Sequence, residues 1–197
     1  MTALPKHITE RFYKILKGDI SVDAFEQWLY ADKELEKYLP PEDYLDLISL
    51  SFKKSGARHE LWKLLRKHID LGAFETYKML DLLREAQQNT ARLPYILIEF
   101  YNLYCKGYRF LQNLGIDYGL SVEVPLIKNT TAETWEELTT NQQKKLINSF
   151  SPDLEEEIDR IINWIEIKKI ILTGEQDDLG HYDYEDKRTA KEKEPTL

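Results

Sequence analysis

The chain has 197 residues, of which 42% are hydrophobic and 31% charged, a composition typical of a globular protein that can bury a core of its own. The formal net charge of −8 argues against a general grip on nucleic-acid phosphates. The lone Cys105 excludes an internal disulfide, and neither a signal-peptide pattern nor an apolar run of about 20 residues that would span a membrane is present, so we expect a cytoplasmic protein.

The first 90 residues predict a series of short amphipathic helices. Apolar residues recur there at helical spacing, and the segments end at Gly18, at Pro40-Pro41 and at Ser55-Gly56. The six predicted helical segments are 7–17, 21–32, 33–39, 41–52, 57–69 and 74–87. Trp28 shares one helix face with Phe25 and Leu29, so we expect Trp28 to be buried against another helix. No fixed repeat of about 34 to 47 residues is visible, which argues against a solenoid.

Residues 93–120 carry apolar side chains around most of a helix, which is the pattern of a buried helix. Pro94 suits its first turn, and Gly115 suits a left-handed cap at its end. We therefore expect a central helix near 94–114. Its tyrosines are open to two interpretations, as core residues or as a stacking surface for a ligand, and aromatic residues at helical spacing favour the core.

The segments after Gly119 are more varied. Residues 120–124 alternate and predict a short strand, whereas 140–150 and 152–169 predict helices. Two short alternating stretches around the turn at 178–180 predict a β-hairpin near 169–185. We expect a mainly α fold, an irregular multi-helix bundle around the central helix, forming a single domain over 1–186 with a helical half (1–90) and an acidic half (91–186). The charged residues 187–197 predict a frayed tail.

No strong enzyme motif is present in the sequence. There is no glycine-rich phosphate loop, no paired-cysteine zinc pattern and no His-Glu-x-x-His helix, so an enzyme is the less favoured interpretation. His68 lies on an apolar helix face, which indicates a core histidine rather than a catalytic one. Cys105 lies on the expected buried helix, where a cysteine behaves as a small apolar residue rather than as a nucleophile.

Acidity belongs to the second half of the chain. Residues 1–90 carry 14 Lys and Arg against 15 Asp and Glu, and residues 91–197 carry 13 against 20. The densest polar cluster is in the predicted hairpin, and the candidate partner-binding residues there are Glu175, Asp177, Asp178, His181, Asp183, Glu185 and Asp186. Glu155 to Glu157 form a second candidate surface.

The same hairpin cluster admits a metal-site interpretation. Carboxylates are ligands for hard divalent cations. A calcium-binding EF-hand loop does not fit this stretch. When Gly180 is placed at the invariant glycine position of such a loop, Leu179 falls where an oxygen ligand is required. We therefore predict no metal and no cofactor, and keep a metal-dependent enzyme or regulator that uses Asp177, Asp178, Asp183 and Asp186 as the alternative function.

Residues 18–39, GDISVDAFEQWLYADKELEKYL, resemble the opening of a widespread group of small bacterial proteins, some of which look like immunity proteins that neutralise a toxin. The resemblance covers about the first 70 residues by eye, with a weaker echo between Tyr104 and Gly119. It implies a bacterial protein but transfers no functional residue to this chain.

We therefore expect a protein-interaction protein, most concretely a toxin-neutralising immunity protein that binds a basic protein partner. Opposite charge would speed the capture of such a partner. A scaffold whose role is assembly is a third possibility, since the sequence does not define an oligomeric state.

Overall fold

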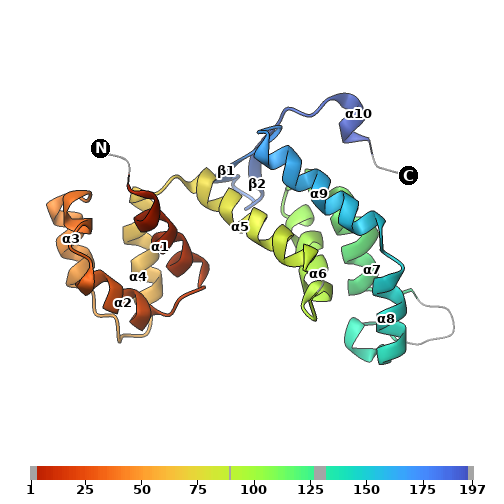
Figure 1. Cartoon of the computed structure of the whole chain (residues 1–197), viewed down its shortest axis with the longest axis horizontal. Helices are drawn as coiled ribbons and strands as arrows, with labels where there is room; N and C mark the ends of the chain where they lie inside the picture. Colours follow the sequence, from red (N-terminus) through yellow and green to blue (C-terminus); the bar gives the residue numbers. More distant parts are fainter. Residues whose placement is uncertain (1–3, 89, 127–131, 195–197) are drawn as a thin grey trace. The chain divides into compact units, whose positions relative to one another are not determined.

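The computed structural model describes residues 4–88, 90–126 and 132–194. The fold is mainly α with a small antiparallel hairpin near its C-terminal end, as the sequence predicts (Figure 1). The chain divides into two compact units, residues 1–74 and residues 75–197, which we call unit 1 and unit 2. None of the described helices is long and apolar enough to cross a membrane.

Unit 1 is a set of short helices around one apolar cluster. Its elements are α1 (Lys6–Lys17), α2 (Val22–Ala31), η1 (Leu35–Lys37), α3 (Pro41–Ile48), α4 (Ala57–Leu65), η2 (Arg66–His68) and the start of α5 (Leu71–Gln87). Gly18 ends α1 in the left-handed conformation, with φ of 99°, and its N–H donates to the carbonyl of Lys14. The Ser21 hydroxyl accepts from the Ala24 N–H at 3.1 Å and so caps α2. These breaks confirm the helix limits that the sequence predicts there.

Trp28 packs against a neighbouring helix, but it is only half-buried. Its ring centre lies 6.3 Å from that of Phe12 on α1 and 5.3 Å from that of Phe25 on its own helix. Phe12 and Phe25 are themselves fully buried. The predicted packing against another helix is therefore confirmed, but Trp28 is less buried than predicted because Phe25 and Leu29 take the innermost positions of α2.

Unit 2 contains the rest of α5 and all later elements. These are α6 (Leu93–Cys105), η3 (Arg109–Leu111), the π-helix η4 (Asn113–Gly119), α7 (Leu120–Glu123), η5 (Trp135–Glu137), α8 (Thr140–Asn148), α9 (Asp153–Glu166), β1 (Ile170–Gln176), β2 (Tyr182–Asp186) and α10 (Ala190–Lys193). Helices α5, α6 and α9 contribute to one apolar cluster. Within unit 2, α5 and α9 run side by side (Figure 1), and Arg84 of α5 donates to Glu166 of α9 at 3.0 Å.

The helix predicted over 94–114 ends at Cys105. Gly107 turns the chain with φ of 113°, and the N–H of Tyr108 donates to the carbonyl of Leu103 at 3.1 Å, which is a glycine-based helix stop. Gly115, the predicted stop, lies instead inside η4. A β-carbon on Gly119 would lie 2.3 Å from the carbonyl oxygen of Leu97, so a glycine is required where η4 crosses α6.

The structure corrects one further sequence expectation and describes most of the predicted tail. Residues 120–123 form the helix α7 instead of a strand, because the chain continues out of η4 in helical conformation and buries Val122 completely. In the tail predicted over 187–197, the N–H of Lys187 donates to the carbonyl of Lys169 at 2.8 Å and Thr189 begins α10 with a capping box, whereas residues 195–197 lie outside the described residues. The expected hairpin is confirmed, with Ile170 opposite Asp186 and Leu172 opposite Tyr184.

Candidate functional site

The side chains of β2 alternate between the two faces of the hairpin. Tyr182 and Tyr184 point toward the core, where the ring of Tyr182 stacks on the buried Tyr108 at 4.7 Å between ring centres. Asp183 and Glu185 alternate with them and are exposed. Burial raises the pKa of the Tyr184 hydroxyl. The inner face therefore docks the hairpin on unit 2, and the outer face carries the acids.

Asp177 and His181 shape the turn of the hairpin. The Asp177 carboxylate accepts from the N–H of Leu179 at 2.9 Å and from the N–H of His181 at 2.8 Å. The His181 Nδ1 lies 3.1 Å from its other oxygen. The hydrogen bonds from His181 and Leu179 hold the pKa of Asp177 below its ordinary value. These two predicted contact residues therefore have a local structural role.

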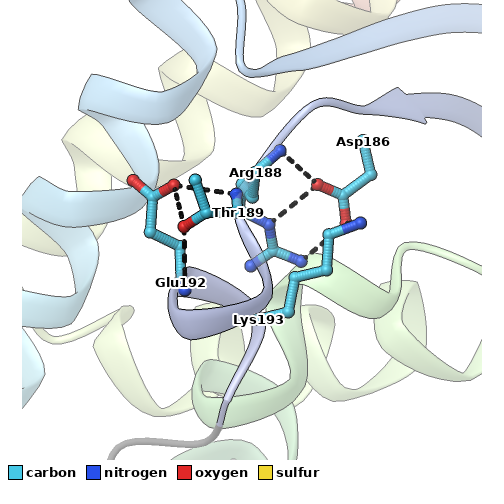
Figure 2. A network of polar contacts seen from close by, with 5 residues as sticks. All are labelled: Asp186, Arg188, Thr189, Glu192 and Lys193. Atoms are coloured by element: carbon cyan, nitrogen blue, oxygen red, sulfur yellow. Dashed lines mark hydrogen bonds and ion pairs between the residues drawn. The ribbon is translucent and has the colours of Figure 1, made fainter.

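Asp186 faces away from the predicted acidic surface, because it continues the inner alternation of Tyr182 and Tyr184. It accepts two hydrogen bonds from the Arg188 guanidinium, at 3.0 Å and 3.1 Å, and lies 3.4 Å from the Lys193 Nζ. Arg188 and Lys193 hold the pKa of Asp186 below its ordinary value, although burial opposes that shift. Figure 2 shows these contacts, which occupy Asp186 within its own chain.

Five of the six predicted acids are exposed on the hairpin, and four of them, all except Asp177 in the turn, accompany an exposed leucine. Leu179 is 81% exposed at the turn, directly after Asp178. We call Glu175, Asp178, Leu179, Asp183 and Glu185 the acidic hairpin surface. Lys187 pairs with Glu185 at 2.9 Å, and both side chains are more than half exposed. Sequence reasoning noted Leu179 only as a residue that cannot bind a metal.

The metal-site alternative finds no geometric support in the part of the chain that the structure describes. No three His, Cys, Asp or Glu side chains there come together in a group that would hold a metal ion. Asp177 is turned into the hairpin turn, Asp186 lies at the Arg188 side, and Asp183 is on the outer face. Strand alternation thus separates Asp183 from Asp186, and the turn contacts of Asp177 occupy its carboxylate.

The second predicted surface, Glu155 to Glu157, does not form one exposed face of α9. Glu155 and Glu156 are exposed, whereas Glu157 is only 5% exposed. Arg160 donates to Glu157 at 2.6 Å, and burial raises the pKa of Glu157 despite the opposing effects of Arg160 and of a hydrogen bond from Asn113. Its burial was readable from the sequence, because position 157 falls at helical spacing within the apolar series Leu154, Ile158 and Ile161.

A small pocket opens beside Glu157, between α9, the 109–113 segment and residues 188–194. Its empty space is about 300 Å³, including the part open to solvent, and its wall includes Trp164 and Arg188. The Arg188 guanidinium carbon lies 4.6 Å from the centre of the Trp164 ring. Sequence reasoning missed this arrangement because it assigned Arg188 to a frayed tail.

The remaining sequence candidates have ordinary roles. The His68 side chain is 6% exposed, and its Nε2 lies 3.2 Å from a carboxylate oxygen of Asp43, in keeping with a core histidine. Cys105 is exposed at the end of α6, so its predicted burial is wrong. The early end of α6 explains this difference, because Cys105 lies in the last turn instead of mid-helix.

Comparisons with models of protein families, with curated proteins and with solved structures give no match.

Proposed function

We propose that this protein binds a basic protein partner through the acidic hairpin surface. The observation that carries the proposal is Leu179, a large apolar side chain that stands 81% exposed among carboxylates. Protein interfaces have an apolar centre within a polar rim, so Leu179 would supply affinity by being buried in the partner. The surrounding carboxylates select a partner of opposite charge.

The charge distribution supports a partner that is basic. Unit 2, which carries the hairpin, has 15 Lys and Arg against 23 Asp and Glu, a net charge of −8. A field of one sign raises the association rate of an oppositely charged protein and makes that rate dependent on ionic strength. The resemblance of residues 18–39 to immunity-like proteins makes a basic nuclease toxin our concrete candidate, encoded in a neighbouring reading frame.

Affinity capture from a lysate, followed by kinetic measurement on the captured protein, tests the proposal. Wild-type protein should retain a basic partner whose association slows as salt is raised. Leu179→Ala should speed dissociation, and the double change Asp178→Asn with Asp183→Asn should slow association. Glu42→Gln, an exposed acid of unit 1, is the matched control and should change neither rate.

Two results would overturn the proposed function. One is a captured partner that is acidic or whose association is insensitive to salt. The other is a partner that binds the Leu179→Ala and double variants at wild-type rates, since the contact surface would then lie elsewhere.

A further inference from the structure

The end of β2 forms a slot for a planar cation, and Arg188 fills it. The Arg188 Nε and Nη2 donate to the two oxygens of Asp186 at 3.1 Å and 3.0 Å. The same guanidinium lies 4.6 Å from the centre of the Trp164 ring. A paired carboxylate fork together with an aromatic face favours a guanidinium over an ammonium group, because only the guanidinium is planar and donates two parallel hydrogen bonds.

The slot is built from elements that belong to the folded body of unit 2. Trp164 lies on α9 and is 6% exposed within the apolar cluster, and Asp186 is the last residue of β2. Glu157 lies two helical turns before Trp164 and is attracted electrostatically to Arg188. Two carboxylates thus favour a cation at this position.

The segment that supplies Arg188 is held by polar contacts and not by apolar packing. Its contacts are the N–H of Lys187 with the carbonyl of Lys169, the pair of Lys169 with Glu192, and the pair of Lys193 with Asp186. The one apolar residue of 187–194, Ala190, is exposed. The pairs of Lys169 and Lys193 are partly exposed, so they contribute little to stability and weaken with salt. The Arg188 side chain, which is only 9% exposed, is therefore the main anchor of the segment, and a second guanidinium would compete with it directly.

We propose that this arginine slot, defined by Asp186 and Trp164, receives an arginine side chain of the basic partner, and that residues 187–194 occupy it in the free protein as an internal competitor. The identity of the partner rests on the function proposed above, whereas the preference of the slot for a guanidinium group does not. Figure 2 shows the competing segment in place, with Arg188 on Asp186 and with Thr189 bonded to Glu192 at the start of α10.

The variant Arg188→Ala tests the slot without a partner, because it empties the slot and leaves Asp186 and Trp164 in position. Millimolar n-propylguanidine should raise the melting temperature of Arg188→Ala, since a ligand that binds only the folded state stabilises it. The response to n-propylamine, which has the same charge without the planar fork, should require at least about tenfold more ligand. Wild-type protein should respond much less than the variant, because Arg188 occupies the site.

Two further variants locate the probe. Adding Asp186→Asn to Arg188→Ala should abolish the response to n-propylguanidine, as should adding Trp164→Leu in a protein that still melts cooperatively. The control Lys191→Ala, an exposed residue of α10 outside the slot, should behave as wild type. An equal response to the guanidine and the amine, or a response that survives Asp186→Asn, would overturn the slot.

The partner role is tested separately on a captured partner. Arg188→Ala should tighten binding, because the internal competitor is gone, and Asp186→Asn should weaken it. Wild-type affinity in both variants would overturn that role while leaving the probe result intact. Conversely, a probe response without any captured partner would count against the proposed function and not against the slot.

Discussion

The two units differ in their net charge and in the ionisable groups that they bury. Unit 1 has 12 Lys and Arg against 12 Asp and Glu, whereas unit 2 accounts for the whole net charge of −8. Unit 1 buries a histidine, His68, beside an acid, and unit 2 buries an acid, Glu157, beside arginines. Under the proposed function, unit 2 would attract the basic partner electrostatically, whereas unit 1 has no net charge.

Each unit also has an apolar cluster of its own. Phe12 and Phe25 lie fully buried in the cluster of unit 1, and Phe100 and Leu114 lie fully buried in the cluster of unit 2. Because no buried residue belongs to both clusters among the described residues, damage to one core should be felt first in that unit.

Removing one buried phenylalanine from each core should have the largest effect. We expect Phe12→Ala and Phe100→Ala each to lower the unfolding free energy of its unit by about 3–5 kcal/mol, since each leaves a large cavity in a fully buried site. Hydrogen exchange resolved along the chain should show faster exchange over residues 6–68 for Phe12→Ala and over residues 93–172 for Phe100→Ala.

The outcome that would break the comparison is equal acceleration in both units by either variant. The chain would then unfold as one cooperative body, and the division into units would be geometric only.

The glycines show what the sequence determines about this fold and what it does not. A glycine after an amphipathic segment, such as Gly18, is a local signal, and the structure has a helix end there. Gly107 and Gly115 lie in the same apolar run, and the sequence pattern does not distinguish them. Gly107 stops α6, while Gly115 and Gly119 allow close contact with residues 97–104. That requirement comes from a contact distant in sequence, so a local pattern cannot reveal it.

The candidate site shows the same division. The hairpin and its exposed acids follow from local alternation, so the acidic hairpin surface was predictable apart from the role of Leu179. Alternation also places Asp186 on the inner face with Tyr184, a signal that grouping the acids by composition overlooked. The pairing of Arg188 with Trp164 joins residues 24 positions apart, and nothing in the local sequence indicates it.

An intermediate effect on stability is expected when a packing residue of unit 1 is compared with a surface residue of unit 2. The two residues are Trp28 and Asp178. Because Trp28 is half-buried, Trp28→Ala should cost about 2 kcal/mol, less than a fully buried aromatic residue would. Asp178→Ala should change stability by no more than about 0.5 kcal/mol, as exposed substitutions usually do. Urea denaturation of both variants measures the difference. A damaging Asp178→Ala beside a neutral Trp28→Ala would reverse the structural roles assigned to the two residues.

The smallest expected effect concerns the pH dependence of folding stability, which should have opposite signs for one buried group in each unit. Burial lowers the pKa of His68 from its ordinary value of 6.5, against the opposing attraction of Asp43, so the unfolded chain binds a proton more readily at this site than the folded one. The stability that neutral His68 supports is therefore present above pH 6.5 and is lost as the pH falls toward the folded-state pKa. Compared with His68→Gln, wild-type protein should lose stability on acidification.

The contribution of Glu157 to the pH dependence of stability has the opposite sign. Burial raises its pKa above the ordinary value of 4.5, so the folded protein binds the proton more readily than the unfolded chain. Its contribution is fully present below pH 4.5 and is lost as the pH rises through the folded-state pKa. Compared with Glu157→Gln, wild-type protein should therefore gain stability on acidification. Urea denaturation of the wild type and both variants across this pH range compares the slopes, and subtracting each variant removes the titration of the other groups. Two slopes of the same sign would show that the paired charges, Asp43 for His68 and Arg160 for Glu157, outweigh burial in one of the units.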